Sequence, residues 1–177
     1  MGICRSKQEP NFSDKTYQNT PQFSLQDQLH TVRVVDIYDG DTITVIIYLN
    51  KVYYRYTVRL EGIDTCEMKS KDNTTKNLAL QARKRLFELI SKEKVIIEPT
   101  ISRKELREIL NKNVYLIRLK CGEFEKFGRL LGTIYSETSS RISFEKSFNN
   151  ILLKEKFAYS YEGKTKLTEE EQVELLV

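Results

Sequence analysis

A nine-residue segment, RLEGIDTCE at positions 59–67, carries four charged side chains among apolar ones. The alternation that leads into it predicts a β-strand, so its last side chains would emerge at one end of a sheet. A second acidic segment, DGDT, supplies Asp39 and Asp41. Two carboxylates held close together repel each other, and a divalent cation between Asp41 and Asp64 would remove that repulsion. The backbone carbonyl of Thr65 would add a third oxygen ligand. Because carboxylate and carbonyl oxygens are hard ligands, the pattern favours calcium or magnesium over zinc.

Basic side chains accompany the acidic pair. Arg59 precedes Asp64 on the same predicted strand, and Arg129 lies in EKFGRLLG, a segment with a glycine-containing turn. The planar guanidinium matches two phosphate oxygens, so both arginines would hold a phosphate. Glu67, just beyond the expected metal ligands, would accept a proton from a water molecule that attacks phosphorus. A metal ion, two arginines and one base are together sufficient for phosphodiester hydrolysis.

Each of these residues also has a purely structural interpretation. Asp-Gly is a common turn sequence, a lone arginine is usually half of a surface ion pair, and a lone glutamate is usually solvated. Glu61 keeps this structural interpretation, because it has no assigned partner. The combination of the residues, rather than any one of them, favours a catalytic site.

The segments that position these residues are mostly β-strands. In VYYRYTVRL, alternating positions separate a largely apolar face from a face that carries Arg55 and Arg59, and Asn50 and Lys51 are the expected turn before it. Strands are expected at 31–38, 41–49, 52–60, 94–99, 114–120 and 129–136. Helices are expected at 76–91, 103–111 and 147–154. A further short acidic helix near the C-terminus would be capped by Thr168. This order predicts an α+β, mainly β fold, a five-stranded OB-fold barrel with about three packed helices.

Composition supports one folded domain. The 177 residues carry 29 Lys and Arg against 25 Asp and Glu, a net charge of +4 that permits a polyanionic partner without requiring one. The single histidine, His30, excludes a catalytic histidine pair and a histidine-rich zinc site, and three widely spaced cysteines indicate a reducing compartment. We expect a disordered tail over 1–28, a folded domain over 29–162 and a short acidic segment over 163–177.

The first residues, MGICRSK, match a lipidation pattern. Gly2 followed by Ser6 fits N-myristoylation, and Cys4 stands where palmitate is often added. One myristoyl chain binds a membrane only weakly, so the cysteine and the basic Arg5 and Lys7 would supply the second signal. The expected location is the cytoplasmic side of a membrane.

Three segments together resemble the staphylococcal nuclease-like (thermonuclease) family: DGDT, RLEGIDTCE and EKFGRLLGTIY. The resemblance covers roughly residues 30–162, and the three segments are specific as a set. It implies an OB barrel with three helices and a calcium-dependent nuclease. Such an enzyme cleaves DNA and RNA, preferably single-stranded or locally unpaired, with low sequence specificity, and leaves 3′-phosphates. We expect the protein to be a monomer.

The resemblance also implies roles for individual residues. It assigns calcium ligands Asp41, Asp64 and Thr65 with Asp39 behind them, catalytic residues Arg59, Glu67 and Arg129, and substrate-binding tyrosines Tyr159 and Tyr161. Stacking of bases on tyrosine rings tolerates any sequence. Packing of both tyrosines in the core or at its rim is an equally good interpretation.

The sequence departs from the family pattern at several positions. Cys66 stands where the family usually has proline, which would loosen the loop before Glu67 without removing a ligand. Phe127 replaces a common tyrosine, Lys156 stands where glycine often ends the last core helix, and 99–113 resembles an insertion. Related domains that have lost the charged positions serve as binding modules, so a catalytically weak or inactive nucleic-acid-binding module is the alternative to an active nuclease.

Overall fold

The computed structural model describes residues 10–126, 128–163 and 165–177. The expected lipidation residues Gly2 and Cys4, and Phe127, lie outside the described residues.

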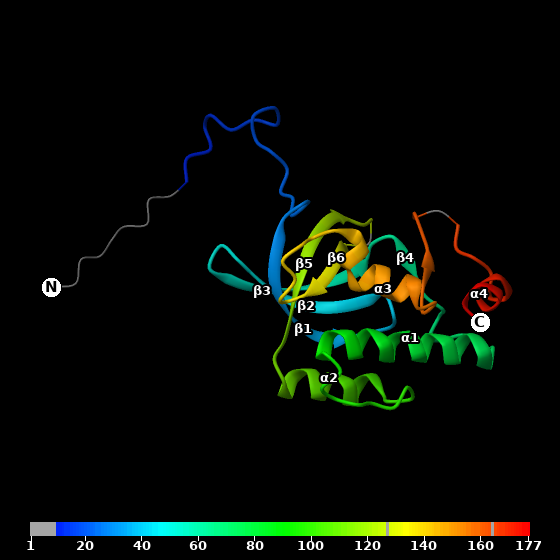
Figure 1. The fold of residues 1–177 in the computed structure, drawn as a ribbon. Helices are drawn as coiled ribbons and strands as arrows, with labels where there is room; N and C mark the ends of the chain where they lie inside the picture. The colour runs from blue at the N-terminus through cyan, green and yellow to red at the C-terminus, as the bar shows by residue number, and fades with distance from the viewer. Residues whose placement is uncertain (1–9, 127, 164) are drawn as a thin grey trace.

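Five strands close into a barrel (Figure 1). They are β1 (Leu29–Ile37), β2 (Thr42–Leu49), β3 (Val52–Leu60), β5 (Tyr115–Phe124) and β6 (Leu130–Ser136). The order around the barrel is β1-β2-β3-β6-β5, and β5 pairs back to β1. Neighbours run antiparallel except β3 and β6, which pair in parallel. This closed mixed barrel with helices around it confirms the predicted OB-fold α+β architecture.

The β2–β3 hairpin follows directly from the sequence pattern. Leu49 pairs with Val52, which leaves Asn50 and Lys51 as a two-residue turn, with φ angles of 49° and 68°. Positive φ at both positions gives a turn whose twist matches that of the flanking strands. Alternate positions along β2 and along the second half of β3 fill the barrel interior, so Arg59 lies on the opposite, outward face.

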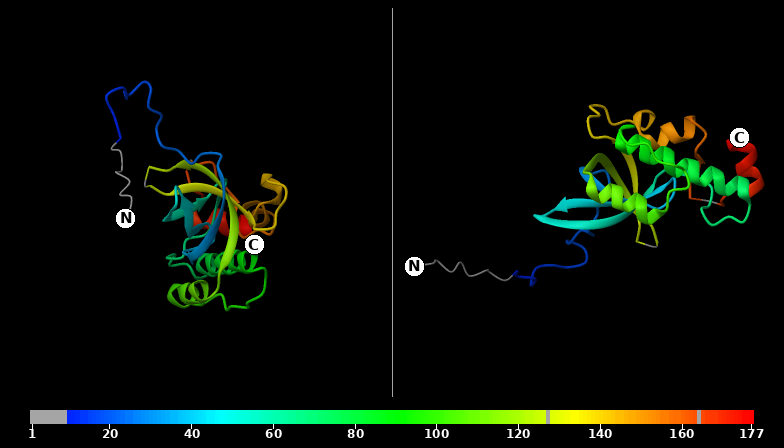
Figure 2. Two further views of the ribbon diagram at one scale, coloured as in Figure 1. Left: turned by 90° about the vertical axis from the view of Figure 1, so that its left-hand side faces the viewer. Right: turned by 90° about the horizontal axis from the view of Figure 1, so that it is seen from below.

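Four α-helices pack outside the barrel in the described part of the chain (Figures 1 and 2). They are α1 (Asn73–Ser91), α2 (Arg103–Lys112), α3 (Phe148–Lys154) and α4 (Glu169–Leu176), with a single 3₁₀ turn at Phe144–Lys146. The predicted caps are present: Ser102 with Glu105, and Thr168 with Glu171, each form a capping box. None of these described helices has the length and apolar character that crossing a membrane requires.

Two segments differ from the sequence-based expectation. Residues 94–99 form no strand; they belong to the loop between α1 and α2, with the Ile96 side chain 88% exposed. The folded domain also begins before residue 29, because Leu25 is buried in the core and Gln28 accepts a hydrogen bond from the Cys121 backbone. A short apolar run alone does not distinguish a strand from a loop that buries only alternate side chains.

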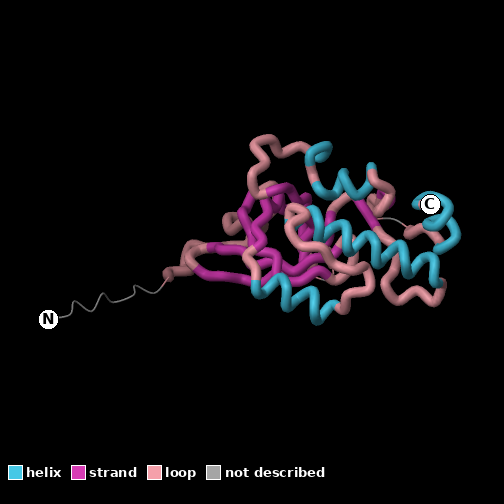
Figure 3. Tube along the Cα trace, turned by 60° about the horizontal axis from the view of Figure 1, so that its bottom comes forward, coloured by secondary structure: helices cyan, strands magenta, loops and turns pink. Residues whose placement is uncertain are grey.

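The C-terminal segment packs against the domain. Strand β7 (Tyr159–Ser160) pairs with β4 (Ile63–Asp64), the two-residue strand that directly follows β3. Helix α4 then lies beside α1, as the tube in Figure 3 shows near the C-terminus. Four buried residues form the contact: Cys66, Ala79, Tyr159 and Leu176. The acidic tail that we expected beyond residue 162 is therefore packed onto the segment that carries Asp64.

Helix α3 ends in a left-handed residue that is not glycine. Lys156 has φ 58°, and the following Phe157 donates its backbone N–H to the carbonyl of Leu152 at 2.9 Å. This geometry satisfies carbonyls at the helix end, but a β-carbon makes it unfavourable.

We expect Lys156→Gly to raise the free energy of unfolding by about 0.5–1 kcal/mol, since glycine adopts positive φ without steric cost. Urea unfolding of the full chain measures the change. The matched control is Lys154→Gly, within α3, which should lower the free energy of unfolding by a similar amount. Equal effects of the two substitutions would contradict the interpretation.

Candidate active site

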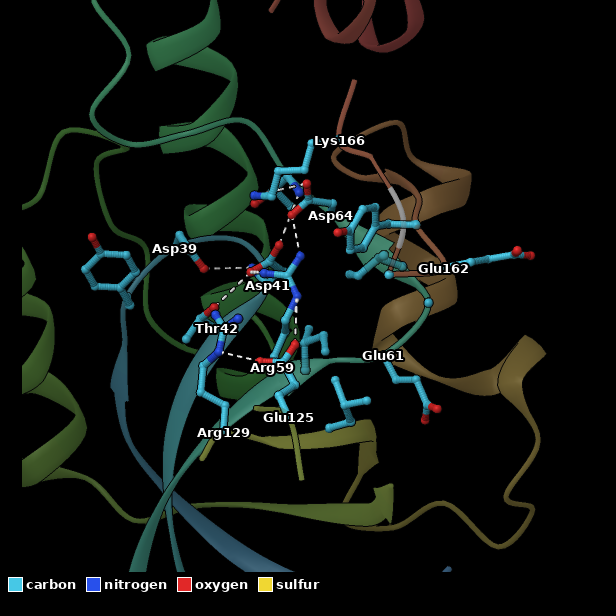
Figure 4. Close-up of a pocket in the computed structure, with 18 of the residues that line it drawn as sticks. Asp39, Asp41, Thr42, Arg59, Glu61, Asp64, Glu125, Arg129, Glu162 and Lys166 are labelled. Atoms are coloured by element: carbon cyan, nitrogen blue, oxygen red, sulfur yellow. Dashed lines mark hydrogen bonds and ion pairs between the residues drawn. The ribbon is translucent and has the colours of Figure 1, made fainter. Parts of the chain in front are cut away.

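A pocket of about 1150 Å³ opens between the β1–β2 turn, the end of β3, the β5–β6 loop and the C-terminal segment (Figure 4). Most of the residues singled out from the sequence line it: Asp39, Asp41, Arg59, Asp64, Thr65, Glu67, Arg129 and Tyr161. They come from four separate parts of the chain, which only the barrel brings together. Tyr159 lies just behind the pocket wall.

Hydrogen bonds hold Asp41, which is 2% exposed. One carboxylate oxygen accepts from the hydroxyl of Thr42 at 2.9 Å and from Arg59 Nη1 at 3.4 Å. The other accepts from the backbone N–H of Thr65 at 3.2 Å. Asp39 accepts from the backbone N–H of Asp41 at 3.1 Å. Asp39 therefore supports the turn that presents Asp41, as expected for a residue behind the ligands.

Gly40 sets the position of this turn. A β-carbon there would lie 2.6 Å from Cβ of Ala82 on α1 and 2.8 Å from Cγ2 of Thr65. Glycine is thus required for close packing of the turn against the helix and not only for turning the chain. The contact fixes Asp41 relative to the segment that carries Asp64.

The two carboxylates Asp41 and Asp64 meet, as the sequence pattern required. Burial and the nearby charge of Asp39 raise the pKa of Asp41 well above its usual range. Burial acts in the same direction on Asp64, but hydrogen bonds from the Tyr159 hydroxyl, from Asp41 and from Arg59 outweigh it and lower the pKa of Asp64. The two carboxyl groups are thus perturbed in opposite directions: the pKa of Asp41 is raised and the pKa of Asp64 is lowered.

Two guanidiniums lie on the same side of the pocket. Arg59 is 7% exposed, and its Nη2 donates to Asp64 at 2.5 Å. Its Nε lies 3.8 Å from one oxygen of Glu125, while Nε of Arg129 donates to the other oxygen at 2.7 Å. Glu125 thus sits between the two arginines, where two oxygens of a phosphate would fit. Sequence reasoning missed Glu125, because its spacing to Arg129 indicates only a local ion pair.

Glu67 is not free, although the sequence suggested a solvated carboxylate. Nζ of Lys166 lies 2.8 Å from Glu67 Oε1 and 3.2 Å from Asp64 Oδ2. The Glu67 side chain is still 58% exposed to solvent. Lys166 was also missed, since nothing in the sequence relates a residue in the C-terminal segment to a loop so far away along the chain.

The two tyrosines of AYSY have different positions. Tyr159 is 2% exposed and its hydroxyl donates to Asp64 Oδ2 at 2.5 Å. A buried ring offers no face to a nucleotide base, so Tyr159 orients Asp64 instead of stacking on substrate. Tyr161 lines the pocket, and its ring centroid lies 5.5 Å from Cζ of Arg59. Strand β7 ends at Ser160, so Tyr161 lies beyond the strand that holds Tyr159 against Asp64.

The donor set fits a hard divalent cation that retains water. The described residues contain no group of three or more His, Cys, Asp and Glu side chains arranged to bind a metal together. Two carboxylates, Asp41 and Asp64, and a backbone carbonyl at Thr65 leave several positions for water and phosphate oxygens, which calcium and magnesium accept. The buried thiol of Cys66, with a pKa raised to about 11 by burial and nearby carboxylates, is a neutral packing group.

Comparison with protein families gives an independent result. The model of the family described as staphylococcal nuclease homologue matches residues 57–177. A search of curated proteins found no match to this chain. The family match begins within β3, and the barrel adds β1, β2 and the DGDT turn to the matched part. It includes α4 and Lys166, and it indicates a nuclease-type hydrolase that acts on nucleic acid. Because the match covers more than half of its length, the chain belongs to the staphylococcal nuclease homologue family.

Proposed function

We propose that the protein is a calcium-dependent nuclease that hydrolyses phosphodiester bonds of DNA and RNA with low sequence specificity and leaves 3′-phosphates. The observation that carries the proposal is the convergence of two carboxylates and two guanidiniums in one pocket, with Glu67 at its edge. The second pocket, which Lys120, Glu123 and Phe144 help to line, has no arginine among its lining residues.

Asp41, Asp64 and the Thr65 carbonyl would hold the cation, which supplies positive charge next to the phosphoryl oxygens. Arg59 and Arg129 would bind the scissile phosphate and stabilise the charge that develops during attack. Glu67, which reaches solvent, would accept the proton of the attacking water. The bond from phosphorus to the 5′-oxygen would break, with a proton taken up from solvent to give a 5′-hydroxyl, and the phosphate would remain on the 3′-oxygen.

Low specificity follows from what the pocket contacts. The arginines recognise phosphate, which every nucleotide carries. Tyr161 offers a ring at the pocket wall, and stacking on a ring does not distinguish strongly between bases. Single-stranded or locally unpaired substrates present a phosphate and an unstacked base together, without the free-energy cost of opening a duplex.

Two charged side chains within the pocket, Lys166 and Glu125, compete with ligands. The ammonium of Lys166 contacts Asp64 and Glu67, where it neutralises charge that the cation would otherwise neutralise. The carboxylate of Glu125 contacts both Arg59 and Arg129, where it takes the place of a phosphate. These internal partners favour the alternative of a weak nuclease or a nucleic-acid-binding module.

Cleavage assays decide between the two functions. Purified full-length protein is incubated with matched single-stranded DNA and RNA in millimolar calcium, in millimolar magnesium or in chelator. We expect cleavage only with calcium, and products whose mobility changes on phosphatase treatment. Arg129→Ala and Glu67→Gln should each lower kcat by about 10²–10⁴, with unchanged melting temperature. The controls are Arg141→Ala and Glu98→Gln, exposed residues away from the pocket, which should leave cleavage unchanged.

An inactive module would give a different result. It would cleave neither substrate in calcium while still binding both. If calcium also failed to raise the melting temperature of the wild-type protein, the proposed cation site would be wrong, because a ligand that binds only the folded state stabilises it.

Lys166→Ala tests the competition at the cation site. Removing the ammonium should lower the calcium concentration for half-maximal thermal stabilisation by roughly 3- to 10-fold, since Asp64 loses a competing partner. Melting curves across a calcium titration measure it, with Lys112→Ala, on the exposed end of α2, as control. An unchanged or raised midpoint would mean that Lys166 does not compete for Asp64.

We propose that the protein is held on the cytoplasmic side of a membrane by acylation of Gly2 and Cys4. The support is the sequence pattern alone. Fractionation of cells that express the wild-type protein or Gly2→Ala tests it. We expect the wild type in the membrane fraction and the variant largely released, whereas equal distributions would exclude a functional myristoyl group.

A further inference from the structure

The outward face of the β2–β3 hairpin runs from the pocket to the hairpin tip. Cross-strand partners share one face of an antiparallel pair, so the register defines this face completely. Its residue pairs, from the pocket outward, are Thr42 with Arg59, Thr44 with Thr57, Ile46 with Arg55, and Tyr48 with Tyr53. Arg59 and Tyr53 lie six positions apart on β3, which places the tip roughly 20 Å from the phosphate-binding arginine.

Exposure increases steadily along this face. Thr42 and Arg59 are each 7% exposed, and the next pair is half-buried. At the far end, Tyr48 is 52% exposed and Tyr53 is 73% exposed. Figures 2 and 3 show the hairpin projecting beyond the body of the barrel. β3 pairs with β6 only through its last three residues, so no described strand borders the outer part of the hairpin on that side.

The chemistry of the face matches nucleic acid. The rings of Tyr48 and Tyr53 lie 4.7 Å apart at an interplanar angle of 42°, which makes one aromatic surface at the tip. Arg55 is exposed between this surface and the pocket, and Lys51 adds a second positive charge at the turn. Aromatic rings that accept bases, with basic side chains that follow the backbone, are the common features of single-strand binding surfaces. The corresponding face of OB barrels is also where oligonucleotides bind.

We propose that this face is an extended binding site for single-stranded nucleic acid, in which bases beyond the scissile phosphate stack on Tyr48 and Tyr53 and a flanking phosphate pairs with Arg55. The proposal builds on the nuclease function, because the strand would enter from the pocket. Continuity with the pocket favours a nucleic acid over an anionic lipid surface, which the basic residues and the exposed tyrosines would also suit.

The test compares a long substrate with a short one. The variant Tyr48→Ala/Tyr53→Ala should weaken binding of a fluorescent 12-nucleotide oligothymidylate about 10-fold, measured by anisotropy in chelator so that nothing is cleaved. In calcium, the kcat/KM of this double variant should also fall about 10-fold for the 12-mer. It should stay unchanged for a thymidine dinucleotide, which is too short to reach the tip. Arg55→Gln should weaken 12-mer binding and reduce the slope of log affinity against log salt concentration by about 0.7.

Matched controls are Tyr17→Ala and Arg141→Gln, both exposed and away from the hairpin, which should bind the 12-mer like the wild type. Equal loss with the 12-mer and the dinucleotide, or no loss of 12-mer binding, would overturn the proposal. If the double tyrosine variant kept 12-mer binding but no longer pelleted with phosphatidylserine-containing vesicles, the tip would be a membrane-binding surface. Tyrosine-dependent 12-mer binding without any cleavage by the wild type would retain the binding site and reject the nuclease.

Discussion

The central constraint in this protein is a pair of carboxyl groups buried side by side. Asp41 and Asp64 are 2% and 1% exposed. Two ionised carboxylates that are buried so close together need positive charge between or beside them. Arg59 supplies that charge through contacts with both. The backbone N–H of Thr65 and the Tyr159 hydroxyl satisfy further oxygens. Crowded negative charge that one arginine neutralises only in part would also give the site affinity for a hard cation.

The barrel holds this arrangement because each participant sits at a strand end. Asp41 precedes β2, Arg59 closes β3, Asp64 ends β4, and Arg129 directly precedes β6. Hydrogen bonds of the closed barrel fix the ends of β2, β3 and β6, and pairing of β4 with β7 fixes Asp64, so small shifts in the loops do not separate the charges. The same geometry makes the hairpin an extension of the site: its outward face begins at Arg59 and keeps one register to the tip.

The C-terminal segment belongs to the site as much as the barrel does. β7 pairs with β4, which brings the Tyr159 hydroxyl to Asp64, and packing of α4 on α1 holds the preceding Lys166 near Glu67. Fraying of α4 would therefore change the charge around Asp64 before it changed the barrel. This coupling links the stability of α4 to the electrostatics of the pocket, because both depend on the small apolar cluster that includes Cys66 and Leu176.

Alternation, turn chemistry and caps determined the barrel strands, the Asn50-Lys51 hairpin and the starts of α2 and α4 from sequence alone, since these depend on residues close together in the chain. The DGDT and RLEGIDTCE segments likewise identified the carboxylates and Arg59. The sequence did not reveal that Glu125 bridges two arginines, that Lys166 contacts Asp64, or that Tyr159 is buried while Tyr161 lines the pocket. The loop character of 94–99 and the insertion of Leu25 into the core were equally hidden. Those features depend on which distant surfaces meet when the barrel closes, and packing in three dimensions, not local pattern, decides that.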